Sequence, residues 1–103
     1  MSMGKYYVRL SPQAFDDIEA LYHYIANEIF APATADKYIE GIYETTKCLS
    51  YLAESFAISS NESLRRLYGT DVRTVVYKKM TIIYNIIDDV AYIRRVIAGS
   101  LIR

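Results

Sequence analysis

The last third of the sequence holds three apolar runs joined by very short connections. The runs cover residues 72–77, 81–88 and 90–97, and they are rich in the β-branched and aromatic side chains typical of strands. Connections this short make neighbouring strands antiparallel. The middle run reads IIYNII at 82–87 and is apolar on both faces, so we expect a central strand buried from both sides.

The first half of the sequence predicts one strand and two helices. Residues 6–10 alternate with period two, and Ser11 with Pro12 then forms a helix start. Pro32 ends this helix and opens a second one, which we expect to run to about residue 52 as the partner in an antiparallel hairpin. The expected buried stripes are Phe15, Ile18, Tyr22, Ile25 and Ile29 on the first helix, and Ala35, Tyr38, Ile39, Ile42, Leu49 and Leu52 on the second.

Together these elements predict an α+β fold. An N-terminal strand, an antiparallel helical hairpin and a three-stranded antiparallel meander form one sheet, within a single domain over residues 1–103. Residues 64–68 fit either a strand or a turn of helix. Because only the hairpin is available to cover the sheet, we expect the second face to be covered by a partner's tail or by a second copy in a homodimer.

The composition places the chain among cytoplasmic proteins without a membrane segment. Its longest apolar run is far shorter than the ~18 residues that a membrane helix needs, and no signal peptide is visible. Cys48 is the one cysteine, so no internal disulfide is expected; we expect it to be a small buried helix residue rather than a nucleophile.

The net charge of zero hides an uneven distribution. Residues 1–63 carry four basic and nine acidic side chains, whereas residues 64–103 carry eight basic and three acidic ones. An uneven solvated surface explains this split without any function; a basic face for an anionic partner, either nucleic acid or an acidic peptide, gives it one. The candidate binding residues are Arg73, Lys78, Lys79, Arg94 and Arg95, interleaved with Tyr77, Tyr84 and Tyr92.

Two further expectations concern these cations. Arg94 and Arg95 are neighbours on a strand, so we expect them to point to opposite faces of the sheet and not to serve one site. Functional cations should lie on the sheet rather than on the helices, so that charge reversal at Arg73 or Lys79 reduces activity while reversal at Lys37 or Lys47 does not.

Several familiar kinds of site are not visible in the sequence. One histidine, His23, and one cysteine do not make a zinc site or a nucleophile with its base, and the four glycines are too scattered for a phosphate loop. Asp88 and Asp89 fit turn residues better than cation ligands. We therefore expect no metal and no cofactor.

The order of elements resembles the RelE/ParE superfamily of bacterial toxins. Residues 71–97, DVRTVVYKKMTIIYNIIDDVAYIRRVI, are similar to the family's C-terminal pattern of an arginine-led strand, an "I-I-Y" central strand, a short acidic turn and a closing "R-V-I" strand. Residues 8–14, VRLSPQA, are similar to the family's passage from strand to helix. The resemblance implies a ParE-like plasmid stabilisation protein, the toxin of a type II toxin–antitoxin module.

The same resemblance implies one of two activities. RelE-like members cleave messenger RNA on the ribosome without a metal, whereas ParE-like members bind and poison DNA gyrase. Thr81 stands where the nucleases often have arginine, Ala98 stands where many relatives have histidine, and the tail offers no tyrosine. Because a proton-transfer group contributes ~100–10,000-fold in rate, we favour a binding toxin over an enzyme.

Two alternatives stay open at this point. One is a RelE-like endoribonuclease, and the other is a degenerate relative that binds its antitoxin without toxicity. In each case the resemblance implies a cognate antitoxin as partner, DNA gyrase or the ribosome and its messenger RNA as target, and contact with operator DNA only through the antitoxin.

Overall fold

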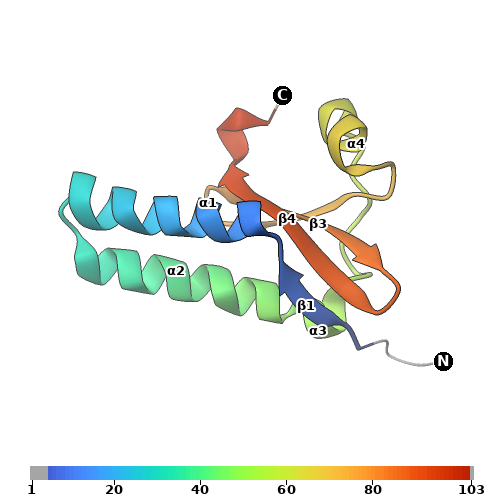
Figure 1. Ribbon diagram of the computed structural model, residues 1–103, viewed down its shortest axis with the longest axis horizontal. Helices are drawn as coiled ribbons and strands as arrows, with labels where there is room; N and C mark the ends of the chain where they lie inside the picture. Colours follow the sequence, from blue (N-terminus) through green and yellow to red (C-terminus); the bar gives the residue numbers. More distant parts are fainter. Residues whose placement is uncertain (1–4, 103) are drawn as a thin grey trace.

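The computed structural model describes residues 5–102 and contains a four-stranded sheet with helices on both sides (Figure 1). The strands are β1 (Tyr7–Leu10), β2 (Arg73–Tyr77), β3 (Met80–Ile87) and β4 (Val90–Ala98), in the order β1-β4-β3-β2. Strands β2, β3 and β4 form the predicted antiparallel meander. Strand β1 pairs with β4 in parallel, so the sheet is mixed and the α+β prediction is confirmed.

The helical hairpin consists of α1 (Pro12–His23), a π-helical segment (Tyr24–Glu28) and α2 (Pro32–Lys47), which lie side by side and project beyond the sheet (Figure 1). Ser11 caps α1 as predicted, because its hydroxyl oxygen accepts a hydrogen bond of 3.0 Å from the Ala14 amide. Within the described residues, no helix is both long and apolar enough to cross a bilayer.

The predicted stripe on the first helix is partly wrong. Phe15 and Ile29 are about half exposed, at 49% and 54%, whereas Ala14, Ile18 and Ile25 are buried. Ala14 and Phe15 lie four and three residues before Ile18, and either spacing can place a side chain on the same helix face as Ile18. In the structure Ala14 takes the buried position and Phe15 does not. The wider turn of the π-helical segment then rotates Ile29 away from the core.

The second helix is shorter than predicted. It ends at Lys47, and a separate short helix, α3 (Leu49–Leu52), follows Cys48 and leaves Leu52 43% exposed. Thr45, Thr46 and Cys48 each donate a hydrogen bond from the side chain to a carbonyl three or four residues earlier. Such bonds bend helices, which gives a physical reason for the interruption.

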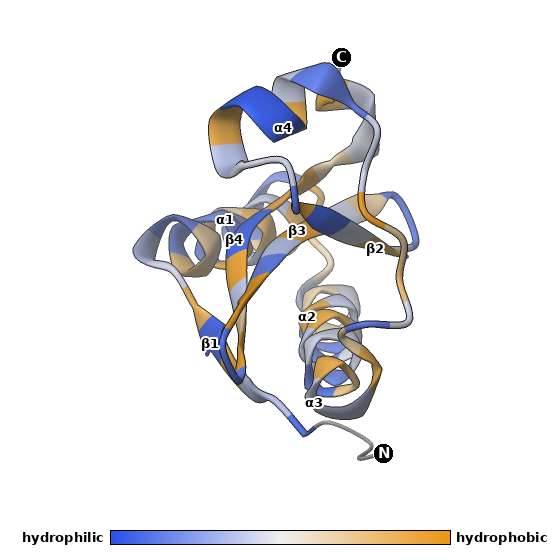
Figure 2. Cartoon of the chain, turned by 90° about the vertical axis from the view of Figure 1, so that its right-hand side faces the viewer, coloured by the Kyte–Doolittle hydropathy of each residue, from blue (hydrophilic) through white to orange (hydrophobic). Residues whose placement is uncertain are grey.

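Residues 64–68 belong to a further helix, α4 (Glu62–Tyr68), which lies on the face of the sheet opposite α2 (Figure 2). Leu64 of α4 packs with Val72 and Ile83, and the partly buried residues around this second cluster are Tyr68, Ile97 and Ile102. The expectation that only the hairpin covers the sheet is therefore wrong. The second cover comes from within the chain, from helix α4 in the stretch of residues 53–69, whose sequence has no clear periodicity.

Gly41 allows Tyr77 to pack against α2. A methyl group at Gly41 would overlap the Tyr77 hydroxyl and ring, with the ring's Cε1 only 2.7 Å away. The Tyr77 ring also contacts Tyr38 edge to face at 5.4 Å, so it has little freedom to move aside. A glycine inside a helix is unfavourable by itself, and here the close packing of a tyrosine compensates for it.

We predict that Gly41→Ala lowers the free energy of unfolding by about 1–3 kcal/mol through overpacking. At an open helical position the same change would raise it by up to ~1 kcal/mol. Urea unfolding followed by circular dichroism measures the difference, with Glu40→Ala on the exposed side of α2 as control. In a Tyr77→Ala background the penalty should disappear; a stabilising Gly41→Ala in the native background would contradict the packing described.

Candidate functional site

The five cations named as candidate binding residues lie in three separate places. Arg73 is on the hairpin side of the sheet, where its guanidinium donates hydrogen bonds to the carbonyls of Glu54 and Phe56 at 3.3 and 2.6 Å. It therefore fastens the loop after α3. Lys78 and Lys79 form the loop between β2 and β3. The Lys78 ammonium lies 5.8 and 5.7 Å from the centres of the Tyr38 and Tyr77 rings.

Arg94 and Arg95 come together on one side of the sheet, contrary to the prediction. Tyr84 pairs with Ile93 whereas Ile83 pairs with Arg95, so Arg94 is the extra residue of a β-bulge. Side-chain alternation slips by one position there. Both arginines consequently line the same pocket. The prediction of opposite faces was wrong because it assumed an unbroken strand.

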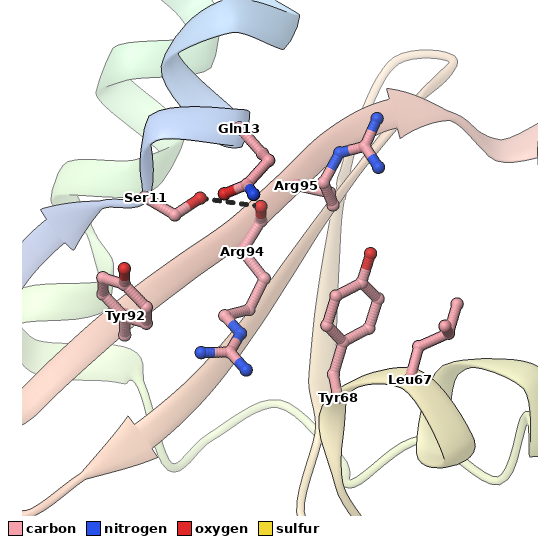
Figure 3. A pocket seen from close by; sticks show the side chains of 7 residues that line it. All are labelled: Ser11, Gln13, Leu67, Tyr68, Tyr92, Arg94 and Arg95. Atoms are coloured by element: carbon pink, nitrogen blue, oxygen red, sulfur yellow. Dashed lines mark hydrogen bonds between the residues drawn. The ribbon is translucent and has the colours of Figure 1, made fainter.

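The pocket, called the β4 pocket below, lies where the start of α1, the strand β4 and the end of α4 meet (Figure 3). Its volume is about 340 Å³, and its lining residues are Ser11, Gln13, Leu67, Tyr68, Tyr92, Arg94 and Arg95. The Ser11 hydroxyl donates a hydrogen bond of 2.8 Å to the Arg94 carbonyl and so joins the helix start to the bulge.

The two arginines of the β4 pocket have different electrostatic surroundings. Arg95 donates from Nε and Nη2 to the two carboxylate oxygens of Asp17, at 2.7 and 3.0 Å. This hydrogen bonding raises the pKa of Arg95 against the opposing effect of burial. Arg94 instead lies over two rings, 5.7 Å from the centre of Tyr68 and 5.3 Å from that of Tyr92. In Figure 3 these rings lie on either side of its side chain.

Asn85 holds the Tyr68 side of the pocket in place. Its amide nitrogen donates to the Tyr68 carbonyl at 3.0 Å and to an Asp71 carboxylate oxygen at 3.1 Å. Asn85 is 4% exposed, and its Oδ1 atom has no hydrogen-bond partner among the described residues. A buried amide in the sheet thus positions a ring that comes from α4.

Sequence reasoning missed Ser11, Gln13, Leu67, Tyr68 and Asp17 as parts of this site. They lie 26 to 84 positions away from Arg94 and Arg95 in the chain, and nothing in their local pattern marks them. Ser11 was recognised only as a helix cap. The acidic pair at 88–89, in contrast, lies in the β3–β4 turn as predicted, with Asp88 at a φ of 55°.

His23, Cys48 and Tyr84 lie away from the β4 pocket, whereas the phenols of Tyr68 and Tyr92 line it. His23 is exposed on α1 beside Glu19, at 3.8 Å. The Cys48 thiol donates to the Thr45 carbonyl, and burial raises its pKa. Tyr84 faces the hairpin side, where burial raises the pKa of its hydroxyl to about 12. Within residues 5–102, no three His, Cys, Asp or Glu side chains come close enough together to hold a metal ion.

The β4 pocket offers groups that can bind an anion. A guanidinium between aromatic rings presents donors to an anion, and none of the lining side chains is a carboxylate, an imidazole or a thiol. Tyr84, which the sequence grouped with the sheet cations, belongs to the other side of the sheet and to the core.

We predict that Asp17→Ala lowers the free energy of unfolding by about 1–3 kcal/mol. Asp17 accepts hydrogen bonds from Arg95 and, at 2.9 Å, from the Val96 amide, so the change leaves both donors without an acceptor. Urea unfolding at neutral pH measures the loss. Asp16→Ala, on the adjacent exposed position, is the matched control and should change stability by less than ~0.5 kcal/mol. Equal effects at the two positions would contradict a bridging role for Asp17.

We also predict that Tyr84→Phe changes the dependence of stability on pH. The Tyr84 hydroxyl donates to the Ala53 carbonyl at 2.7 Å, so at pH 7 its loss should cost about 1 kcal/mol. The pKa of Tyr84 is about 12 in the folded chain and near 10 when unfolded. The native protein should therefore lose about 2–3 kcal/mol relative to the variant as pH rises from 10 to 12.

Unfolding curves of both proteins at pH 7, 10 and 11 measure this difference, and the order of stability should begin to reverse above pH 10. Tyr7→Phe is the control, because Tyr7 is 66% exposed. A constant difference between native protein and Tyr84→Phe across this range would show that Tyr84 ionises as readily in the folded state as in the unfolded one.

Comparison with known proteins covers nearly the whole described chain. The family model described as "ParE toxin of type II toxin-antitoxin system, parDE" matches residues 8–101. Among solved structures, a chain from the "Chromosomal ParDE TA system from P. aeruginosa" superposes with a TM-score of 0.71 at 22% sequence identity. The match covers 94% of this chain and 98% of that chain. A search of curated proteins found no significant match.

The structural likeness supports the fold, and the family match extends from β1 to the 3₁₀ turn at Gly99–Leu101. It includes every strand from Val8 onward and all four α-helices. The chain belongs to the ParE toxin family of type II toxin–antitoxin systems.

Proposed function

We propose that this toxin acts in the cytoplasm by binding an essential target protein, DNA gyrase, and that a cognate antitoxin neutralises it. Membership of the ParE family supports a toxin of a type II module. Gyrase as target and the binding mode follow from the resemblance described above, in which ParE-like members bind gyrase and RelE-like members cleave messenger RNA.

The observation that carries the choice between binding and cleavage is the surroundings of Thr81 and Ala98. Thr81 is buried in β3 opposite Val76 and Ile97, and Ala98 pairs with Met80 at the same end of the sheet. A ribonuclease of the RelE type would need an acid or base there. The adjoining loop offers the cations Lys78 and Lys79 and no carboxylate or imidazole.

Other proton-transfer candidates cannot replace them. His23 belongs to the hairpin and is exposed beside Glu19, and Tyr84 is buried with its hydroxyl engaged. Because general acid–base catalysis requires the group within hydrogen-bond reach of the reacting atom, these residues do not support RNA cleavage. The sheet and its loops instead offer exposed cations and rings, which suit contact with a macromolecular surface.

We predict that the purified protein inhibits supercoiling by DNA gyrase and leaves ribosome-bound messenger RNA intact. Lys79→Glu, in the exposed β2–β3 loop, should weaken the inhibition at least about tenfold, because reversing a contact charge costs about 1.4 kcal/mol or more. Lys47→Glu makes the same charge change on the exposed end of α2 and should have no such effect. Growth arrest after induction should follow the same order and be relieved by the antitoxin.

Two other results would each identify a different function. Robust messenger cleavage by the native protein, abolished by Lys78→Ala or Lys79→Ala, would replace target binding with nuclease activity. Normal growth and uninhibited gyrase, together with tight binding of the antitoxin, would instead identify a non-toxic relative.

A further inference from the structure

Arg94 is a guanidinium without a carboxylate partner among residues 5–102, although it lies in a well-formed pocket. Its neighbour Arg95 is satisfied by both oxygens of Asp17. None of the seven residues that line the β4 pocket is acidic. The pocket therefore keeps roughly one uncompensated positive charge, which is enough for one monovalent anion.

The surroundings of Arg94 prepare it to bind such an anion. Contacts with the rings of Tyr68 and Tyr92 restrict its side chain, so less conformational entropy is lost on binding. Tyr68 is itself held by Asn85, and the Arg94 backbone is held by Ser11. A restrained guanidinium presents its paired N–H groups in the planar arrangement that matches the two oxygens of a carboxylate.

Apolar groups around the pocket indicate what carries the anion. Leu67 of α4 is 67% exposed at the pocket, and the Tyr68 and Tyr92 rings add aromatic surface beside the charge. Such a combination suits an acidic side chain next to apolar residues on a protein segment, because tyrosine and arginine are typical central residues of protein interfaces.

A nucleic-acid strand fits these observations less well. It presents a phosphate at every nucleotide and is held by a row of cations. Two of the candidate cations do not continue such a row: Arg73 is on the opposite side, bound to backbone carbonyls, and Lys79 lies in the loop beyond the end of β4, where its carbonyl accepts from the Gly99 amide.

We propose that the β4 pocket binds the carboxylate of an acidic side chain, flanked by apolar residues, on a partner protein. This deepens the proposed function, since it names the chemistry by which the toxin recognises a protein. In the complex, the carboxylate accepts two hydrogen bonds from Arg94, and the neighbouring apolar side chains of the partner pack on Tyr68, Tyr92 and Leu67.

The test uses the isotope-labelled full chain and three probes: the capped tripeptide acetyl-Leu-Glu-Phe-amide, its Gln counterpart, and a uridine tetranucleotide. Nuclear magnetic resonance titration follows the backbone amides of residues 92–96 and the Arg94 Nε–H. We expect the Glu peptide to shift these signals and to bind about tenfold more tightly than the Gln peptide, as charge-assisted bonding predicts.

Variants of the two arginines locate the interaction. Arg94→Gln should reduce binding of the Glu peptide to the level of the Gln peptide, and Arg94→Lys should give an intermediate value because it keeps the charge but not the paired donors. Arg66→Gln removes the same charge from the exposed side of α4, outside the pocket, and should leave binding unchanged.

Three results would overturn the proposal. Equal binding of the Glu and Gln peptides would exclude carboxylate recognition, and this comparison needs no variant. Equal losses in Arg94→Gln and Arg66→Gln would indicate a diffuse charge effect. Stronger shifts at residues 92–96 with the tetranucleotide would indicate a nucleic-acid site. Since gyrase inhibition is measured separately on the native protein, a failed pocket and a failed gyrase proposal can be told apart.

Discussion

The burial of β3 on both faces is the constraint on which the rest of the structure depends. Residues 80–85 are all buried, and among them Tyr84 and Asn85 point their polar groups to opposite sides of the sheet. Buried polar groups need hydrogen-bond partners. Tyr84 donates to the Ala53 carbonyl after α3, and Asn85 donates to the Tyr68 carbonyl at the end of α4. One strand thereby determines where two otherwise unrelated segments lie.

The β-bulge at Arg94 has an equally specific consequence. In an unbroken strand Arg94 or Arg95 would have pointed into the core beneath the hairpin, where a charge without a partner is costly. The extra residue keeps Ile93 and Val96 on the hairpin side and places both arginines on the other. Asp17 then serves Arg95 and the Val96 amide together, so α1 is fastened to β4 where β1 has ended.

Some of the cations hold parts of the fold together, and others are available for contact with a partner. Arg73 and Arg95, which the sequence suggests as binding residues, are engaged in holding a loop and a helix to the sheet. Arg94, Lys78 and Lys79 have no carboxylate partner among the described residues. His23 lies exposed on the hairpin, and Tyr84 lies in the core with its hydroxyl engaged. The proposal of a toxin that acts through contact with another protein rests on this distribution.

Local patterns in the sequence were sufficient to predict the N-terminal strand, the helical hairpin and the three-stranded meander, in that order. The apolar run at 82–87, the Ser11–Pro12 helix start and the short connections at 78–79 and 88–89 depend on interactions within a few residues, and each was confirmed. The family resemblance, carried by residues 71–97 and 8–14, was likewise confirmed by the match over residues 8–101. The sequence also showed that cations are concentrated in the last three strands and their connections. It did not show which of these cations share a site.

Only the tertiary structure decided which distant groups meet. Whether Ala14 or Phe15 faces the core, whether 64–68 forms a helix, and on which side Arg94 and Arg95 lie were each open locally, because two arrangements satisfied the same periodicity. The choice depends on packing and hydrogen bonds between residues up to about 80 positions apart, such as Asp17 with Arg95. Contacts of this kind leave no periodic trace along a single chain, since they form only when the sheet and its two covers have come together.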